Sequence, residues 1–159
     1  MNLKNLKKPI RIMFICHGNI CRSPMAEFIL KDMVAKAGQA DEFVIASSAT
    51  STEEIWNGIG NPVYLPAKDQ LAKHGIFCSG KRAVQLQKGD YNKYDLFLYM
   101  DHANLRNALR ILGGDPDGKV KMLLPDRDVS DPWYTERFDV AYRDIEEGCR
   151  LLFAEIMQK

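Results

Sequence analysis

The feature that most constrains the fold is a short apolar run that leads directly into a turn and then into a helix start. Residues 10–16 are rich in β-branched and aromatic side chains, which is typical of a buried strand. A turn follows, and Ser23-Pro24 then supplies a helix cap and a proline suited to the first helical position. Apolar residues at helical spacing begin at Met25 and end near Gly38. The sequence therefore predicts a strand, a loop and a helix in immediate succession.

The rest of the chain repeats this alternation with different loops. Strands are predicted at residues 43–46, 76–79 and 96–100, and a last strand or extended connector at 119–124. Helices are predicted over residues 67–74, 101–112 and 138–157, and polar loops over 47–66 and 126–134. Alternating strands and helices of this length indicate an α/β fold, with a parallel sheet covered by helices on both faces.

Length and composition exclude several other classes of protein. A chain of 159 residues fits one domain spanning 1–159, and a net charge of +1 makes no electrostatic case for nucleic acid or an acidic membrane as partner. The four cysteines are too sparse for a disulfide scaffold and do not form the paired motifs of a zinc site. No stretch approaches the roughly 20 apolar residues of a membrane span. We therefore expect a cytoplasmic protein with reduced thiols.

The loop after the first strand is where chemistry is expected, because ligands of parallel sheets bind beyond the carboxyl ends of the strands. A cysteine with an arginine six residues later is a weak signal by itself. The complete segment is far more specific, with a chance frequency on the order of 10⁻⁶. It reads Cys16-His17-Gly18-Asn19-Ile20-Cys21-Arg22-Ser23-Pro24.

Backbone N–H groups of such a loop, at a helix N-terminus, can surround one tetrahedral anion. Gly18 is expected to supply unusual backbone angles, and Asn19 to hold the loop through side-chain hydrogen bonds. Arg22 offers a planar fork to two phosphate oxygens. These positive groups favour the thiolate of Cys16, and Ser23 is placed to donate a hydrogen bond to its sulfur. The segment therefore predicts an anion site with a nucleophile beneath it.

A sulfur that attacks phosphorus needs an acid to protonate the leaving oxygen. Asp131, in Asp131-Pro132-Trp133-Tyr134, suits this role because it lies on a polar loop that can close over the site. Trp133 and Tyr134 can wall a slot for a flat substrate, and Trp56 on the long loop can form the opposite wall.

Taken together, these motifs resemble the low-molecular-weight protein tyrosine phosphatase family over essentially the whole chain. The resemblance is carried by the segment 16–24, by Ser48-Ala49-Thr50, by Met100-Asp101 with Asn104-Leu105, and by the segment 131–134. It implies a twisted four-stranded parallel sheet and hydrolysis of phosphotyrosine in proteins or peptides through a phosphocysteine. Inorganic phosphate is the implied product, and no metal or cofactor is implied.

The same resemblance assigns roles to individual residues. Cys16 is the implied nucleophile, Arg22 the phosphate clamp, and Asp131 the general acid that later activates water. Cys21 resembles the neighbouring cysteine that traps the oxidised nucleophile as a reversible disulfide. The implied contacts to phosphate or substrate are His17, Gly18, Asn19, Ile20, Cys21, Ser23, Trp56, Trp133 and Tyr134.

Four positions depart from the common pattern of the family. His17 stands where many members carry a small or aliphatic residue, and it is expected at the rim of the site. Ser47 replaces a common aspartate, and Trp133 a common tyrosine. Lys81 stands where bacterial members often have a histidine that supports the phosphate loop. These departures concern the rim and the support of the loop and leave the reaction itself intact.

Three other activities share parts of this pattern. Protein arginine phosphatases of the family carry threonine at the position of Ile20, so Ile20 favours phosphotyrosine. Thioredoxin-coupled arsenate reductases need two further cysteines close together, and only Cys78 lies near the expected region. A phosphocysteine carrier would not need Asp131. We expect Cys78 and Cys149 to be small apolar core residues.

Overall fold

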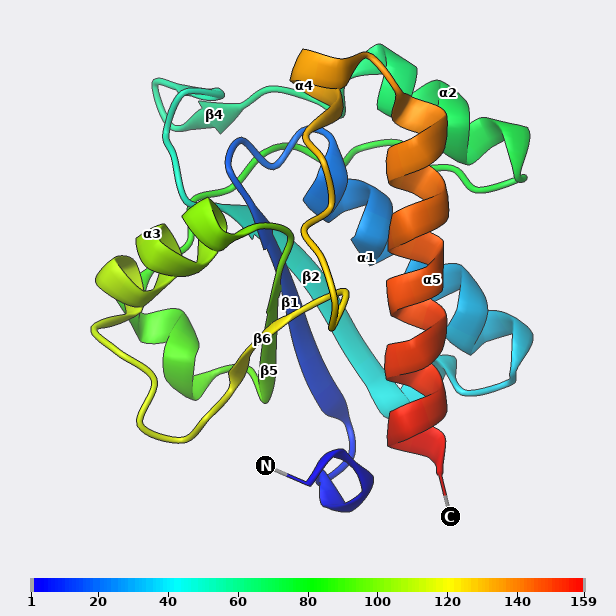
Figure 1. The fold of residues 1–159 in the computed structure, drawn as a ribbon, viewed down its shortest axis with the longest axis vertical. Coiled ribbons are helices and arrows are strands. Elements are labelled where there is room, and N and C mark those ends of the chain that lie inside the picture. Colours follow the sequence, from blue (N-terminus) through cyan, green and yellow to red (C-terminus); the bar gives the residue numbers. More distant parts are fainter. Residues whose placement is uncertain (1, 159) are drawn as a thin grey trace.

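Four parallel strands form the central layer of the computed structural model, which describes residues 2–158 (Figure 1). Their order is β2-β1-β5-β6, so β1 lies between β2 and β5. The chain passes from β1 to β2 on one side and later returns to β5 on the other side of β1. The carboxyl end of β1 is therefore the point at which the strand order reverses, where parallel sheets bind ligands. The strands are β1 (Ile10–Cys16), β2 (Phe43–Ala49), β5 (Leu96–Tyr99) and β6 (Val120–Met122).

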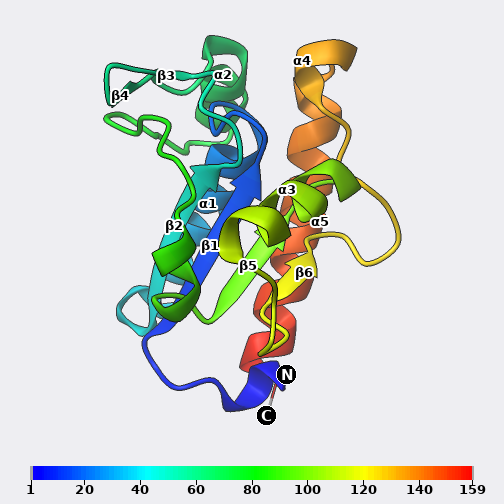
Figure 2. The same ribbon diagram turned by 90° about the vertical axis from the view of Figure 1, so that its left-hand side faces the viewer.

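Helices cover both faces of the sheet, as expected for strands that are buried on both sides. Ile12 and Phe14 of β1 belong to the core cluster formed with α1 (Arg22–Lys36), α2 (Leu65–Lys73) and α5 (Phe138–Met157). Met13 and Ile15 belong to the smaller cluster formed with α3 (His102–Leu112). The alternation follows from the two-residue period of a strand. In Figure 2, α3 lies in front of the strands and α5 behind them.

The first unit ends close to where the sequence predicts. Helix α1 begins at Arg22, so Ser23 and Pro24 lie in its first turn and Ser23 is not the cap. The helix ends at Lys36, and Gly38 follows with φ of 71°, a left-handed conformation that glycine adopts without strain. A helix start can shift by a residue or two because the cap depends on local contacts that a pattern does not specify.

Three other predictions need correction. Residues 76–79 form no strand. Ile76 and Cys78 are buried in an irregular connection, so their apolar character indicates that they are buried and not that they pair in a sheet. The predicted loop 47–66 contains the last residues of β2 and a short hairpin of β3 (Ile55–Trp56) and β4 (Ile59–Gly60). The loop 126–134 contains the start of α4 (Pro132–Thr135). Short 3₁₀ segments occupy Leu3–Asn5, Ala40–Glu42 and Lys88–Asn92.

The elements that surround the end of β1 come from distant parts of the chain. The β3–β4 hairpin, α2 and α4 gather at the same end of the molecule as the loop that follows β1 (Figure 1). Across residues 2–158, the helices lack the length and apolar character that a bilayer crossing requires.

Candidate active site

The loop between β1 and α1, residues 17–21, curls around the sulfur of Cys16. The backbone N–H groups of Asn19 and Ser23 point to this sulfur at N···S distances of 3.3 and 3.4 Å, and the Ser23 hydroxyl lies 3.0 Å from it. No side chain caps the N-terminus of α1. The backbone N–H of Arg22, the first residue of this helix, is therefore available to a bound anion. The expected anion loop over a cysteine is present in the geometry.

Asn19, and not Gly18, adopts the unusual backbone conformation of this loop. Asn19 has φ of 58°, whereas Gly18 has no positive φ. Asparagine tolerates the left-handed region better than other residues with a side chain. Gly18 has a steric role instead, because a Cβ atom there would lie 3.2 Å from Cγ of Glu54. The expectation that Gly18 supplies the special angles is therefore wrong.

The side chain of Asn19 ties the loop to its surroundings. Its Nδ2 donates to Ser23 Oγ at 2.7 Å and to Ser47 Oγ at 2.9 Å, and its Oδ1 accepts from the backbone N–H of Val84 at 3.0 Å. Because the Ser23 oxygen already accepts from Asn19, its hydroxyl proton is free to point to the Cys16 sulfur. The predicted hydrogen bond from Ser23 to the sulfur is consistent with this arrangement.

A buried ion pair lies beneath this network. Ser47 Oγ donates to Glu27 Oε1 at 2.6 Å, and Lys81 Nζ lies 3.3 Å from the same oxygen and 3.0 Å from the Ser47 carbonyl, to which it donates. Burial lowers the pKa of Lys81, and Glu27 opposes that effect. Ser47 and Lys81, two of the four departures from the family pattern, thus belong to one cluster. Glu27 was missed because nothing in its local sequence marks it as buried.

Arg22 is held by two hydrogen-bond acceptors and faces a further carboxyl group, all from segments that follow β5 and β6 in the chain. Its Nη1 donates to Asp101 Oδ2 at 2.7 Å and to the Val129 carbonyl at 2.9 Å, and its Nη2 lies 3.5 Å from Asp131 Oδ2. Burial would lower the pKa of Arg22, but the negative charges of Cys16, Asp101 and Asp131 raise it overall. Asp101 also caps α3, so one carboxylate connects that helix to the guanidinium.

Asp131 faces Arg22 from the loop before α4. Its Oδ1 accepts from the backbone N–H of Trp133 at 3.0 Å, as the cap of α4, and its side chain remains 28% exposed. A cavity of about 340 Å³ lies between this loop and the loop of Cys16. The lining residues are Cys16, His17, Gly18, Ile20, Cys21, Arg22, Glu53, Glu54, Asp131, Trp133 and Tyr134.

The aromatic walls agree with the sequence prediction on one side only. Trp133 and Tyr134 line the cavity and are 53% and 82% exposed. Trp56 was expected on the opposite side, but it lies in β3, is 80% exposed and does not line the cavity. The side chain is carried away by the β3–β4 hairpin, and Glu53 and Glu54, just before it, form that wall instead. Sequence analysis missed both glutamates because two charges in a polar loop carry no distinctive signal.

His17 lies at the rim, where it was expected. Its side chain is 48% exposed, and its Nε2 lies 3.0 Å from Oε2 of Glu53. The rim therefore carries a partly exposed polar pair, one member of which directly follows Cys16 in the chain.

The other three cysteines are all free and buried. Burial raises the pKa of the Cys21 thiol well above its usual range, and the charges of Cys16 and Asp131 raise it further. Cys21 therefore stays protonated at neutral pH, although it lines the same cavity as Cys16. Cys78 and Cys149 belong to the main hydrophobic core, as predicted.

Comparison with known proteins gives a consistent result. A family model described as low molecular weight phosphotyrosine protein phosphatase matches residues 11–159. The low molecular weight protein-tyrosine-phosphatase YfkJ of Bacillus subtilis is 33% identical over 156 residues, which cover 94% of this chain and 97% of the relative. Its crystal structure matches with a TM-score of 0.87 at 32% identity, over 97% of this chain and 98% of that chain.

Two further solved structures have the same fold. The low molecular weight protein tyrosine phosphatase SP-PTP of Streptococcus pyogenes matches with a TM-score of 0.84 and 33% identity, over 94% of this chain and 95% of that chain. Vibrio vulnificus Wzb in complex with benzylphosphonate matches with a TM-score of 0.77 and 25% identity, over 89% of this chain and 95% of that chain. In each comparison the similarity extends over nearly the full length of both chains.

Proposed function

The chain belongs to the low molecular weight phosphotyrosine protein phosphatase family, a group of phosphoric monoester hydrolases, and from that premise we propose that it hydrolyses phosphotyrosine through a phosphocysteine. The observation that carries the proposal is the arrangement in one cavity of the Cys16 sulfur, Arg22 and Asp131. The complex of Wzb with benzylphosphonate, an aryl-bearing phosphonate, supports the aromatic substrate. We treat residues 1–159 as one phosphatase domain.

The first step transfers the phosphoryl group to sulfur. The Cys16 thiolate attacks phosphorus, a sulfur–phosphorus bond forms, and the bond from phosphorus to the phenolic oxygen breaks. Asp131, in its protonated form, donates its proton to that oxygen, so tyrosine leaves as a neutral phenol. Arg22 and the N–H groups of residues 17–22 stabilise the negative charge on the transferring oxygens.

The second step releases inorganic phosphate. Asp131, now a carboxylate, takes a proton from a water molecule whose oxygen attacks phosphorus, and the sulfur–phosphorus bond breaks. The electron pair returns to the Cys16 sulfur, which the Ser23 hydroxyl, 3.0 Å away, stabilises as a thiolate. Asp131 ends the cycle protonated and ready for the next substrate. These two reaction steps require no cofactor.

Peptides that carry phosphotyrosine, phosphoserine or phosphoarginine test the substrate class. We expect phosphotyrosine to be the preferred substrate, because the buried side chain of Ile20 and the ring of Trp133 give the cavity apolar walls. The Ile20→Thr variant should move the preference towards phosphoarginine. A preference of the unmodified enzyme for phosphoarginine would make it a protein arginine phosphatase, and arsenate-dependent oxidation of reduced thioredoxin would make it an arsenate reductase.

We also propose that Cys21 protects the nucleophile, in a cytoplasmic, reducing setting that suits four free thiols. Hydrogen peroxide oxidises the Cys16 thiolate to a sulfenic acid and releases hydroxide. The Cys21 thiol then attacks the sulfenic sulfur, a disulfide forms, and water leaves. Activity lost to mild peroxide should return with dithiothreitol, and return less completely in Cys21→Ser. Equal recovery in both proteins would exclude this role.

A further inference from the structure

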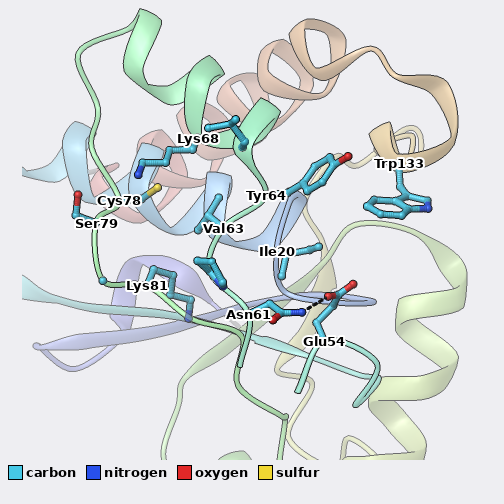
Figure 3. Close-up of a pocket in the computed structure, with 13 residues that line it drawn as sticks. Ile20, Glu54, Asn61, Val63, Tyr64, Lys68, Cys78, Ser79, Lys81 and Trp133 are labelled. Atoms are coloured by element: carbon cyan, nitrogen blue, oxygen red, sulfur yellow. Dashed lines mark hydrogen bonds between the residues drawn. The ribbon is translucent and has the colours of Figure 1, made fainter. Parts of the chain in front are cut away.

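A second cavity, of about 540 Å³, is lined by the residues drawn in Figure 3, and it adjoins the catalytic cavity. Ile20, Glu54 and Trp133 line both cavities, so the two are neighbours. Volumes of roughly 300–1,000 Å³ are usual for sites that hold small ligands or side chains. A molecule bound in the catalytic cavity can therefore extend into the second one, which we call the side groove.

Between its two ends, the side groove has an apolar and firmly built surface. The backbone N–H of Tyr64 donates to the carbonyl of Ile20 at 2.8 Å, which joins the groove wall to the phosphate loop. The rings of Tyr64 and Trp133 lie 5.0 Å apart between centroids. Val63 is buried below them, whereas Leu65 is 63% exposed. These side chains offer a surface that an apolar residue of a ligand can cover.

The charges of the side groove differ between its two ends. At the catalytic end, Glu54 accepts a hydrogen bond from Asn61 Nδ2 at 2.8 Å. Lys68 lies at the opposite end from Trp133 and Glu54 (Figure 3). Lys68 is exposed and forms none of the ion pairs found among residues 2–158, whereas the amine of Lys81 is engaged by Glu27. The groove thus runs from an acidic end, through an apolar middle, to a free cation.

We propose that the side groove binds the segment of the substrate protein that flanks the phosphotyrosine. It selects an apolar residue near the phosphotyrosine and an acidic residue farther from it. The inference rests on the proposed phosphatase function and specifies its substrate. The apolar residue covers the surface formed by Ile20, Val63 and Tyr64, and the acidic residue pairs with Lys68. Glu54, together with Glu53 at the catalytic rim, disfavours an acidic residue immediately beside the phosphotyrosine.

Phosphotyrosine peptides with altered flanks test the charge preference. One set carries leucine near the phosphotyrosine and glutamate beyond it, on either side, and a second set carries lysine in place of glutamate. We expect a higher kcat/KM for the glutamate set. Lys68→Glu should lower kcat/KM for the glutamate set roughly two- to tenfold, because an attractive surface pair becomes a repulsive one. In 0.5 M salt, the difference in kcat/KM between this variant and the unmodified enzyme should be smaller.

Lys73→Glu is the matched control, because Lys73 is an exposed lysine of the same helix that does not line the groove. The apolar contact is tested by Leu65→Gln, with the exposed Leu151→Gln on α5 as control. Leu65→Gln should lower kcat/KM for leucine-containing peptides roughly threefold, and leave alanine-containing peptides unchanged. All four variants should hydrolyse p-nitrophenyl phosphate, which fills only the catalytic cavity, at the unmodified rate.

The outcomes separate this inference from the proposed function. If the unmodified enzyme hydrolyses p-nitrophenyl phosphate and phosphotyrosine peptides but shows no preference for their flanks, the side groove is not a substrate site. Equal effects of Lys68→Glu and Lys73→Glu would overturn the inference in the same way, because they would reflect net charge alone. Failure of the unmodified enzyme to hydrolyse any aryl phosphate would instead overturn the proposed function, and this inference with it.

Discussion

The phosphate loop and the loop that carries Asp131 meet at one cavity, yet they are held in place very differently. The phosphate loop comprises residues 17–21 and the first turn of α1. In it, Asn19 and Ser23 are 1% and 0% exposed; their side chains are hydrogen-bonded to one another, and Asn19 also donates to Ser47 of the sheet. On the opposite loop, Trp133 and Tyr134 are 53% and 82% exposed. Among the residues that the structure describes, the Asp131 carboxyl group contacts only the backbone N–H of Trp133, in its own loop, and Arg22, at 3.5 Å.

The proposed mechanism gives each loop a different task, which accounts for this difference. Charge that develops on a transferring phosphoryl group is best stabilised by dipoles that are already in position. A buried, interlocked loop meets that need. A loop that delivers a proton must also let the substrate enter and the product leave, which an exposed loop with few ties permits. We therefore expect changes in the phosphate loop to cost both activity and stability, and changes in the opposite loop to cost activity alone.

The largest effect is expected for Cys16→Ser. Serine keeps the shape of the side chain, but its hydroxyl is a much weaker nucleophile than a thiolate, so turnover of a phosphotyrosine peptide should fall on the order of 10⁴-fold or more. Binding of vanadate, measured by calorimetry, should persist because Arg22 and the loop N–H groups remain. Activity near the unmodified level would refute a covalent intermediate.

Asp131→Asn should lower kcat roughly 10²- to 10⁴-fold for a phosphotyrosine peptide, because the leaving oxygen loses its proton donor. The loss should be smaller for p-nitrophenyl phosphate, whose leaving group needs less protonation. The midpoint of thermal unfolding should change little, since the side chain is partly exposed. Asp128→Asn, on the same loop and paired with His102, is the matched control. Undiminished turnover in Asp131→Asn would remove this residue from the mechanism.

Arg22→Lys should lower kcat/KM roughly 10²- to 10³-fold, because lysine keeps the charge but not the fork that holds two oxygens. Unlike Asp131→Asn, this change should also lower stability, since the Asp101 carboxylate and the Val129 carbonyl lose their shared donor. Urea unfolding of the two variants side by side measures the contrast. Equal stability would show that Arg22 is no better fixed than Asp131.

Lys81→Met should destabilise the protein by about 2 kcal/mol, because the buried carboxyl group of Glu27 loses one of its two lysine partners. Activity should fall as well, since Ser47 and Asn19 are positioned above this pair. Lys31→Met removes the other lysine that contacts Glu27. Because Lys31 is 43% exposed, the free energy of unfolding should fall by less than about 1 kcal/mol. A double variant, Lys81→Met with Glu27→Gln, should recover much of the stability lost in Lys81→Met.

The smallest effect is expected for Tyr134→Ala. The ring is 82% exposed, so the free energy of unfolding should change by less than about 0.5 kcal/mol. If the ring contacts the substrate, KM for a phosphotyrosine peptide should rise roughly two- to tenfold with little change in kcat. An unchanged KM would assign the substrate wall to Trp133 alone.

The phosphate loop was predicted well because its residues are consecutive in the chain. Cys16, Arg22 and Ser23 all lie within one strand–loop–helix unit, so spacing alone brings them together. Asp131 was placed from the chemical need for an acid and from its aromatic neighbours. Glu27 and Glu54 carry no comparable signal, because their roles depend on partners far away in sequence.

The wrong predictions for residues 76–79 and for Trp56 also arise because a local sequence pattern does not specify contacts with distant or paired segments. Residues 76–79 are apolar because they face the core, and burial alone does not determine whether a segment pairs as a strand. Trp56 was placed at the site because aromatic rings often line clefts. Its direction depends on the two-residue pairing of β3 with β4, which a polar loop sequence does not reveal.

By itself, the sequence determined the alternation of strands and helices and the loop around Cys16, and it supplied the proposed nucleophile, clamp and acid, because these depend on neighbouring residues and on the chemistry of each side chain. Only the tertiary structure decided how that loop is supported, by Lys81 and Glu27 beneath it and Asp101 beside it. It also decided that the side groove opens onto the catalytic cavity. Such contacts join residues from different elements, and they exist only once the sheet and helices have packed.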